Sequence, residues 1–412
     1  MMRASPIRKL AWFLAECRSC LRLFCGPDRS WRTIVFYSEH AIYEQYYRGI
    51  IESLLEEPGV SLGYLTSDPN DPILRARQPR IHPCYVRVLL PFVLLWLDAK
   101  VLVLTMTDLH HFHLRRSLKG AHHVYVFHAL FSTHMVFREG AYDYYDTILC
   151  AGPHHLRELE RRRQLVGRPE AMLLPAGYPW VDTLAANYRA YRQQASPPSH
   201  PSDPRPLVLI APSWGASNIV ELCAAELASA LIRAGFRVVV RPHPETVKRQ
   251  PELIATLQRR LAAMPDASLE LAFLSDRSIF DADVLITDWS SISLEYAFAT
   301  ERPVLFLDTP RKVNNPNYEA LGLPPLELEI REQIGEIAKP DEPSQVAEAA
   351  RRLIRDRERY RVRILACRDA CLYHTGTSGR VSARYILDIA RTGRAEAVPP
   401  EAVVAETVET AS

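Results

Sequence analysis

The sequence predicts an α/β protein built from two Rossmann-like domains that face each other across a cleft. Short apolar runs alternate with amphipathic stretches in both halves of the chain, a pattern typical of parallel sheets covered by helices. The chain has 412 residues, more than one ordinary domain requires, and 48% of them are hydrophobic. A proline-rich segment, residues 193–206, separates the halves and is predicted to be a linker.

Residues 1–30 form a basic segment with the pattern of an amphipathic helix. Six basic residues oppose only Glu16 and Asp28, which gives this segment a net charge of +4. Between residues 7 and 24, apolar side chains recur at helical spacing: Leu10, Phe13, Leu14, Cys17, Leu21 and Phe24. Two interpretations remain open, a helix packed on its own domain and a helix that docks on a membrane surface. The interrupted apolar stretch argues against a secretion signal.

The first domain is predicted over residues 31–192. Thr33–Ser38 and Val60–Thr66 have the pattern of strands, and Ala41–Leu55 between them has that of a helix, which makes a βαβ unit. Further strands are expected at Val101–Thr105, Val124–Phe127, Tyr145–Pro153 and Met172–Pro179, with a charged helix at His154–Arg163. This half is expected to bind the acceptor substrate.

The most apolar run in the chain is Val88–Leu97. Pro91 interrupts it, and about 20 residues are needed to span a bilayer, so it is too short for a membrane-spanning helix. We interpret it as a buried segment, with contact to a lipid surface as the alternative.

The second domain is predicted over residues 207–392 and is expected to bind a nucleotide donor. Leu207–Gly215, Phe236–Glu245 and Asp283–Ala297 each pair an apolar strand with a polar turn. A final helix, Ser378–Ile389, is available to cross back to the first domain. Two such halves and a crossing helix describe the GT-B architecture, and residues 393–412 have the composition of a disordered tail.

The segment Asp283–Ala297 carries the clearest chemical signal. It reads as a buried strand, a tight turn and a helix whose first turn carries the hydroxyls of Ser290 and Ser291. The free N–H groups and the positive dipole end of such a helix favour an anion, so the turn predicts a phosphate site. The alternative is that Asp288 or Ser290 only caps the helix. Because ligands of open parallel sheets bind at the carboxyl ends of strands, the three turns should form one pocket.

These segments resemble the glycerophosphotransferases that use CDP-glycerol to build polymers of the teichoic-acid type. The matching pieces occur in the family's order between about residues 205 and 392: Ala211–Trp214, Arg241–Pro244, Asp283–Ala297, Arg302–Phe306 and Gly376–Arg380. Trp289 replaces the more usual tyrosine of the family, and Gly215 stands where the family often has arginine.

The resemblance implies a set of site residues. His128 matches a histidine that acts as the base on the acceptor hydroxyl, although Ala129 and Leu130 depart from the family's His-Gly-Thr element. The alternative for His128 is a hydrogen-bonded histidine at a strand end. His243 is the second expected catalytic residue. Contacts to the donor phosphates are expected from Arg241, Thr287, Asp288, Ser290 and Ser291, and other donor-pocket contacts from Ser213, Trp214, Ser378 and Arg380.

Composition narrows the expected partners. The 50 basic and 48 acidic residues nearly balance, so nucleic acid is not an expected partner. The eight cysteines show no paired framework, which indicates a reducing compartment. Cys17 and Cys20 lack a second pair, and the histidines between His110 and His134 share no ligand spacing, so no metal and no cofactor are expected.

We therefore expect an enzyme that transfers a glycerol phosphate, or a related polyol phosphate, from a CDP-activated donor to a hydroxyl of a lipid-linked or polymeric envelope acceptor. We expect it in the cytoplasm, with residues 7–24 as a possible contact to the inner face of the cell membrane. One alternative is a GT-B glycosyltransferase or an epimerase that acts on a UDP-sugar. A second is a catalytically silent scaffold at the membrane.

Overall fold

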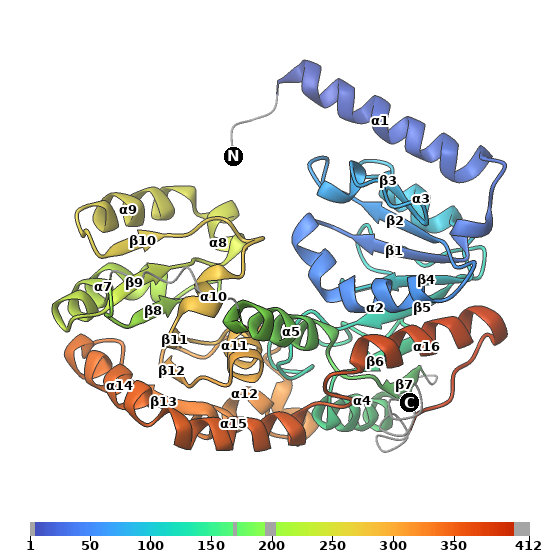
Figure 1. Cartoon of the computed structure of the whole chain (residues 1–412). Helices are drawn as coiled ribbons and strands as arrows, with labels where there is room; N and C mark the ends of the chain where they lie inside the picture. Colours follow the sequence, from blue (N-terminus) through green and yellow to red (C-terminus); the bar gives the residue numbers. More distant parts are fainter. Residues whose placement is uncertain (1–4, 168–170, 194–202, 399–412) are drawn as a thin grey trace. The chain divides into compact units, whose positions relative to one another are not determined.

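The computed structural model describes residues 5–167, 171–193 and 203–398 (Figure 1). Most of the predicted linker and the end of the predicted tail lie outside these residues. The chain divides into two compact units, and each is discontinuous in sequence. The described parts of Met1–Ala129, Phe137–Asp182 and Cys371–Ser412 form the first unit, and those of Leu130–Val136 and Thr183–Ala370 form the second.

The first unit contains a parallel sheet of seven strands in the order β3-β2-β1-β4-β5-β6-β7. Its strands are β1 (Ile34–Ser38), β2 (Leu62–Thr66), β3 (Ile81–Tyr85), β4 (Val101–Leu104), β5 (His122–Val126), β6 (Thr147–Cys150) and β7 (Met172–Pro175). The central strands are continuous apolar runs, and in their register Phe36 pairs with Tyr64 on β2 and with Val103 on β4. All three side chains are buried, as expected for a parallel sheet covered on both faces.

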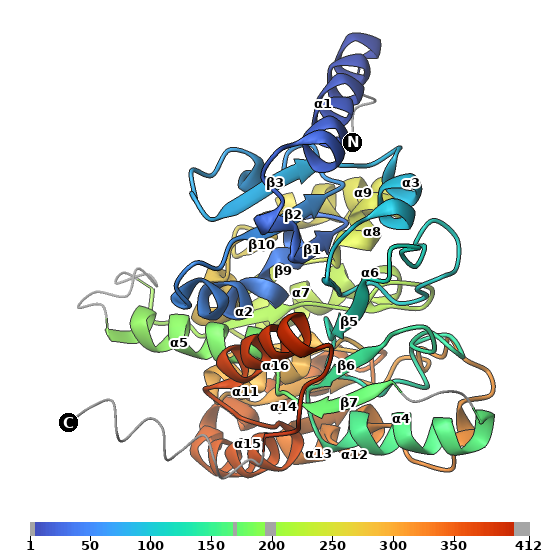
Figure 2. The same ribbon diagram turned by 90° about the vertical axis from the view of Figure 1, so that its right-hand side faces the viewer.

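The helices and 3₁₀ turns of the first unit surround this sheet. Their bounds are α1 (Pro6–Cys25), η1 (Ser30–Arg32), η2 (Ala41–Tyr43), α2 (Glu44–Glu56), η3 (Pro72–Leu74), α3 (Leu90–Trp96), α4 (Pro153–Val166) and α16 (Ser378–Thr392). The predicted crossing helix is α16, which packs on α2 of the first unit (Figure 2). Gly379 allows this close approach, because a Cβ there would lie 2.7 Å from the carbonyl oxygen of Gly49.

The N-terminal helix α1 lies beside the edge strand β3 and contacts it (Figure 1). The buried carboxylate of Glu16 accepts hydrogen bonds from the backbone N–H groups of Arg87 and Leu89, both 2.6 Å long. Ser19 Oγ accepts a third from Tyr85 N at 3.1 Å. Leu23 is the second buried residue of the helix. Most of its other large apolar side chains face solvent: Ile7, Leu10, Phe13, Leu14 and Leu21 are all exposed.

The second unit contains a parallel sheet of six strands in the order β10-β9-β8-β11-β12-β13. They are β8 (Leu207–Ile210), β9 (Arg237–Val240), β10 (Ala267–Leu269), β11 (Val284–Thr287), β12 (Val304–Leu307) and β13 (Gly335–Ala338). The helices are α6 (Ile219–Leu222), α7 (Ala224–Arg233), α8 (Pro244–Arg249), α9 (Pro251–Ala262), α10 (Arg277–Asp281), α11 (Ile292–Thr300), η4 (Tyr318–Leu321), α12 (Leu326–Glu329), α13 (Arg331–Ile334) and α14 (Pro343–Arg355). The chain passes between units along α5 (Pro179–Gln193) and α15 (Arg357–Cys371).

A short segment that follows β5, Leu130–Val136, belongs to the second unit. Ser132 donates hydrogen bonds from its backbone N and its hydroxyl to the buried carboxylate of Glu327, at 2.9 and 2.8 Å. His134 Nε2 donates to the Leu323 carbonyl at 3.1 Å, and Asn315 Nδ2 donates to the His134 carbonyl at 2.9 Å. The second unit therefore includes a piece of sequence far from its other parts.

The predicted α/β class with two parallel sheets is confirmed. The run Val88–Leu97 is the short helix α3, in which Leu90, Val93 and Leu94 are buried while Phe92 and Trp96 are exposed. Among the described residues, none of the helices combines the length and the apolarity that crossing a bilayer requires.

Candidate functional site

The predicted phosphate-binding turns lie in the second unit, directly after neighbouring parallel strands. β9, β8, β11 and β12 are adjacent in the sheet, so their carboxyl ends lie along one edge. Ser213 and Trp214 follow β8, His243 follows β9, and Asp288 follows β11. The structure therefore brings these three turns together, and we call this group of strand-end turns the donor cluster.

Asp288 ties two of these turns together. Its buried carboxylate accepts a hydrogen bond from Ser213 N at 2.6 Å and another from Ile219 N at 3.2 Å. The residue at the N-cap of α11 is Ser291, and it makes no capping bond through its side chain. The carboxylate of Asp288 thus fixes the turn after β8, and with it the position of Trp214.

The hydroxyls of the same segment differ in their availability. Thr287 Oγ1 is buried and donates to the Ala211 carbonyl at 2.6 Å. Ser290 and Ser291 are partly exposed at the start of α11, and their hydroxyls make no hydrogen bond within the part of the chain that the structure describes. Because the first N–H groups of a helix also lack intrahelical partners, these two serines can offer donors to an anion.

Trp289, which replaces the family's tyrosine, is buried behind the donor cluster. Its indole Nε1 donates to the Thr309 carbonyl at 2.9 Å. The Arg331 guanidinium lies over its ring at 4.3 Å and forms an ion pair with Asp308 at 3.1 Å. Trp289 therefore connects the turn after β11, to which it belongs, with the turn after β12.

His243 occupies the N-cap of α8. Its Nδ1 accepts a hydrogen bond from Glu245 N at 3.1 Å. A neutral imidazole whose Nδ1 accepts carries its proton on Nε2, so that atom is a donor. The imidazole ring lies 6.2 Å from the Trp214 ring, between centroids.

Arg241 makes its hydrogen bonds within the protein. The guanidinium donates to the carbonyls of Phe273 and Ser275 at 3.0 and 2.7 Å, and to Ser278 Oγ at 3.2 Å. It also lies 3.4 Å from a carboxylate oxygen of Glu270. Arg241 thus holds the segment that follows β10 in place.

Lys312 is a cationic residue of this cluster that the sequence patterns missed. Its Nζ lies 4.4 Å from the centroid of the Trp214 ring. Burial lowers the pKa of this lysine to about 8, although the nearby charge of Asp288 acts in the opposite direction. Within the described ranges, Lys312 forms no ion pair. The sequence offered only a weak signal for this residue. Arg311 and Lys312 are adjacent basic residues in the loop after β12, and this loop matches no motif.

His128 lies in the first unit, two residues after β5. The rings of Tyr43, Tyr46 and Phe137 surround it with centroids about 6 Å away. Its Nδ1 is 3.3 Å from the hydroxyl of Tyr125. Desolvation lowers the pKa of His128 to about 4, and a hydrogen bond with the backbone of Thr105 only partly opposes this. The imidazole is therefore neutral at pH 7 and can accept a proton.

Ser378 and Arg380 also lie in the first unit. Asp182 accepts hydrogen bonds from Gly376 N at 2.7 Å, from Ser378 N at 3.0 Å and from Ser378 Oγ. Ser378 is buried at the start of α16, whereas Arg380 is exposed. The Gly-Thr-Ser-Gly segment, residues 376–379, thus begins the helix that packs on α2.

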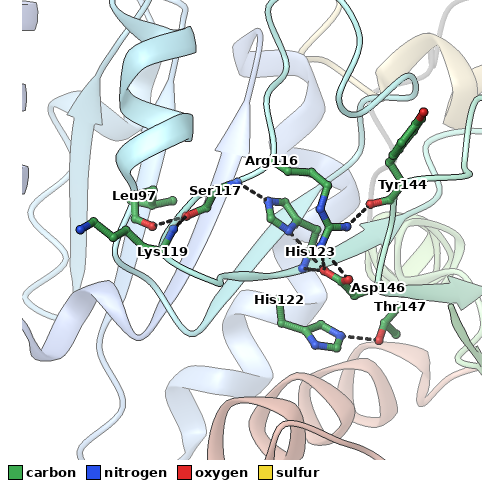
Figure 3. Close-up of polar contacts among 9 residues, drawn as sticks. All are labelled: Leu97, Arg116, Ser117, Lys119, His122, His123, Tyr144, Asp146 and Thr147. Carbon is green, nitrogen blue, oxygen red and sulfur yellow. Dashed lines mark hydrogen bonds and ion pairs between the residues drawn. The ribbon is translucent and has the colours of Figure 1, made fainter. Parts of the chain in front are cut away.

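The histidines near His128 take part in separate contacts. His122 Nε2 is 2.7 Å from Thr147 Oγ1, and His123 Nδ1 donates to Asp146 at 3.3 Å (Figure 3). His134 belongs to the second unit. Over the residues that the structure describes, no group of three or more His, Cys, Asp or Glu side chains is placed to hold a metal ion.

Solved structures of other proteins have a similar fold. The wall teichoic acid polymerase TagF, in a structure soaked with CDPG, is similar with a TM-score of 0.62 at 15% identity, and the match covers 95% of this chain and 99% of that one. A UDP-GlcNAc 2-epimerase from Neisseria meningitidis bound to UDP-GlcNAc has a TM-score of 0.55 at 13% identity, with 86% and 99% of the two chains covered. No curated protein sequence matches the chain.

The chain also matches the sequence pattern of one protein family. The pattern matches residues 29–313, which is more than half of the chain and includes His128 and the whole donor cluster. The chain therefore belongs to the CDP-glycerol:poly(glycerophosphate) glycerophosphotransferase family.

Proposed function

We propose that the donor cluster binds the diphosphate of CDP-glycerol and that the enzyme transfers glycerol phosphate to an acceptor hydroxyl during synthesis of a cell-wall polymer. Membership of the family supports the donor and the reaction. The observation that carries the assignment to this site is a set of donors that follow β9, β11 and β12 at one edge of the sheet. They are His243 Nε2, the hydroxyls of Ser290 and Ser291, and the Lys312 ammonium. Such donors suit phosphate oxygens.

The proposed reaction is an in-line displacement at the phosphorus that carries the glycerol. The acceptor oxygen forms a bond to this phosphorus as the bond to the CMP oxygen breaks, and the electron pair leaves with CMP. His128 takes the proton of the acceptor hydroxyl. His243, Ser290, Ser291 and Lys312 stabilise the charge that grows on the phosphate oxygens. Protein donors are sufficient for this purpose, so the proposal includes neither a metal nor a cofactor.

The test is release of nucleotide by the full-length protein, with CDP-glycerol and with UDP-N-acetylglucosamine as donors. Because removal of one such donor costs about 10²- to 10³-fold in turnover, His243→Ala should lose most of the CMP release. His243→Asn is the sharper variant, because asparagine preserves the N-cap of α8 while the Nε2 donor is lost. CMP release that is unchanged in His243→Asn would remove His243 from the site.

The same assay separates the competing functions. Turnover of the uridine donor alone would favour a glycosyltransferase or epimerase, and binding without any turnover would favour a silent scaffold.

We also propose that α1 docks the enzyme on the inner face of the cell membrane, where a lipid-linked or polymeric acceptor would be reached. The support is that Glu16, Ser19 and the buried Leu23 attach the helix, while apolar residues such as Leu10 and Leu14 are exposed beside basic ones. Phe24 packs against Phe92 of α3, whose ring is also exposed. Co-sedimentation with lipid vesicles measures this docking.

A further inference from the structure

The first unit has a second polar pocket at the opposite end of its sheet from His128. It lies where β1, β4 and β5 begin, whereas His128 follows the end of β5. Its volume is about 320 Å³. The pocket is lined by Arg29, Arg32, Thr33, Asp98, Ala99, Lys100, Lys119 and Gly120. We call it the basic pocket.

The charge of the basic pocket is unbalanced. Four of its lining residues are cationic, and the carboxylate of Asp98 is the single acidic group among them. Within the described part of the chain, none of these five charged groups takes part in an ion pair. Asp98 offsets only one of the four positive charges, and the remaining cations repel one another, so an anion in the pocket would relieve this repulsion.

Arg32 is the buried cation of this pocket. The residue is only 4% exposed. Its Nη2 donates to the carbonyls of Gly26 and Asp28, at 3.0 and 3.4 Å, but its buried Nε has no hydrogen-bond partner. Burial lowers the pKa of Arg32, and the positive charge of Arg29 lowers it further. The buried guanidinium of Arg32 thus adds a positive charge to the wall of the pocket.

The wall that carries Lys119 is held in place by a network of hydrogen bonds (Figure 3). Ser117 Oγ donates to the Leu97 carbonyl at 2.7 Å and accepts from Lys119 N at 2.9 Å. Ser117 N donates to His123 Nε2 at 3.3 Å, which fixes the His123 proton on Nδ1, where it faces Asp146. The loop before β5 is therefore tied both to the segment carrying Asp98 and to the start of β6.

Arg116 completes this network. It forms an ion pair with Asp146 at 2.8 Å. Burial alone would raise the pKa of Asp146, but hydrogen bonds from His123 and the Arg116 pair hold it well below its usual range. Asp146 consequently stays ionised at neutral pH, and the position of Lys119 is set before any ligand arrives.

We propose that the basic pocket binds the phosphate group of an anionic ligand. Arginine and lysine side chains are suited to phosphate oxygens, and the pocket has room for one such group with its substituent. Two sources share this chemistry, a soluble phosphate compound and the headgroup of an anionic lipid. The Lys119 ammonium also lies 5.5 Å from the ring of the exposed Trp96, so polar and apolar contacts adjoin at the rim.

The test uses the full-length protein and the double variant Lys100→Gln/Lys119→Gln, because both lysines are exposed and their loss leaves the buried Arg32 intact. The matched control, Lys339→Gln/Arg357→Gln, removes two exposed cations of the second unit. One arm measures binding of inorganic phosphate and pyrophosphate by calorimetry. The other measures co-sedimentation with phosphatidylglycerol vesicles against phosphatidylcholine vesicles.

The proposal expects the pocket variant to bind about tenfold more weakly than the control in at least one arm, since two charge-assisted contacts are lost. If the pocket variant binds phosphate or pyrophosphate more weakly, the ligand is a soluble anion. If only its binding to phosphatidylglycerol vesicles is weaker, the ligand is a lipid headgroup. Asp98→Asn should tighten the same binding, because it removes the one opposing charge. Equal binding by the pocket and control variants in both arms would overturn the proposal, and CMP release by these variants reports on the donor cluster separately.

Discussion

At the scale of single residues, Lys312 gives the donor cluster its pH dependence. Because burial lowers its pKa to about 8, the ammonium is present at pH 7 and is lost as the pH rises through that value. A phosphate ligand favours the charged form. We therefore expect the affinity for CDP-glycerol to fall between pH 7 and pH 9 in the wild type, and to fall much less in Lys312→Arg, because arginine stays charged.

At pH 7, Lys312→Gln should weaken binding of CDP-glycerol about tenfold or more, the value typical of a hydrogen bond to a charged group. Titration calorimetry measures this effect. Lys339→Gln serves as the control, since Lys339 is an exposed residue with one weak ion pair at 3.8 Å. Equal affinity in Lys312→Gln and the wild type would exclude a contact between Lys312 and the donor.

His128 predicts a second pH effect, on stability. Its folded pKa of about 4 lies below the ordinary value of 6.5, so the unfolded chain binds more protons between these pH values. Stability is therefore lost as the pH falls through this range. Between pH 7 and pH 5 the loss due to His128 should be about 2 kcal/mol. Urea unfolding at pH 7 and pH 5 measures this loss in the free energy of unfolding. The loss should be smaller by this amount in His128→Gln than in the wild type. An identical loss in the two proteins would show that His128 is solvated.

Single residues also show where the sequence stops being informative. The motifs predicted that Asp288 and Arg241 contact the donor phosphates and that Ser378 lines the donor pocket, but they did not predict the bonds that these residues form within the protein. Asp288 bonds Ser213 N across 75 positions in the chain, and Arg241 bonds carbonyls more than 30 positions away. Such pairs depend on strand order and crossover lengths, which local patterns do not specify.

At the scale of elements, the contact between α2 and α16 depends on the absence of a side chain. A Cβ at Gly379 would lie 2.7 Å from a backbone oxygen of α2, which cannot rotate away. Gly379→Leu should therefore lower the free energy of unfolding by about 1–3 kcal/mol, as overpacked contacts do. Arg391→Leu, on the exposed side of α16, is the control and should change it little. Thermal denaturation compares the two, and equal midpoints would contradict this close packing.

Strands differ in how far their sequences predict them. β1, β4, β8 and β11 are buried apolar runs, and the sequence located each within one or two residues. The edge strands β3, β10 and β13 went unpredicted because they bury few side chains and have little apolar pattern. β3 even contains Pro83, which an edge strand tolerates because its missing N–H costs the sheet no ladder bond there.

At the scale of the whole chain, the order of motifs was enough to predict the two-sheet fold, the family and the glycerophosphotransferase function, and all three are confirmed. The discontinuity of the units could not be predicted in this way. Leu130–Val136 joins the second unit through Glu327 and Asn315, and nothing in its own sequence indicates partners almost 200 positions away. The basic pocket was missed for the same reason, since its cations come from three separate segments.

Binding of the whole molecule to a membrane should have two separable parts. Leu10→Glu/Leu14→Glu removes apolar contacts of α1 while Glu16 and Ser19 still hold the helix, so binding to neutral vesicles should fall at least about tenfold. Binding to anionic vesicles should fall further, because the two added carboxylates are repelled by them. Lys9→Gln should weaken binding to anionic vesicles only, and added salt should remove this difference by screening. Vesicle flotation at two salt concentrations measures both parts. If the double glutamate variant floated as well as the wild type, α1 would not be the docking element, and the exposed apolar face would need another partner.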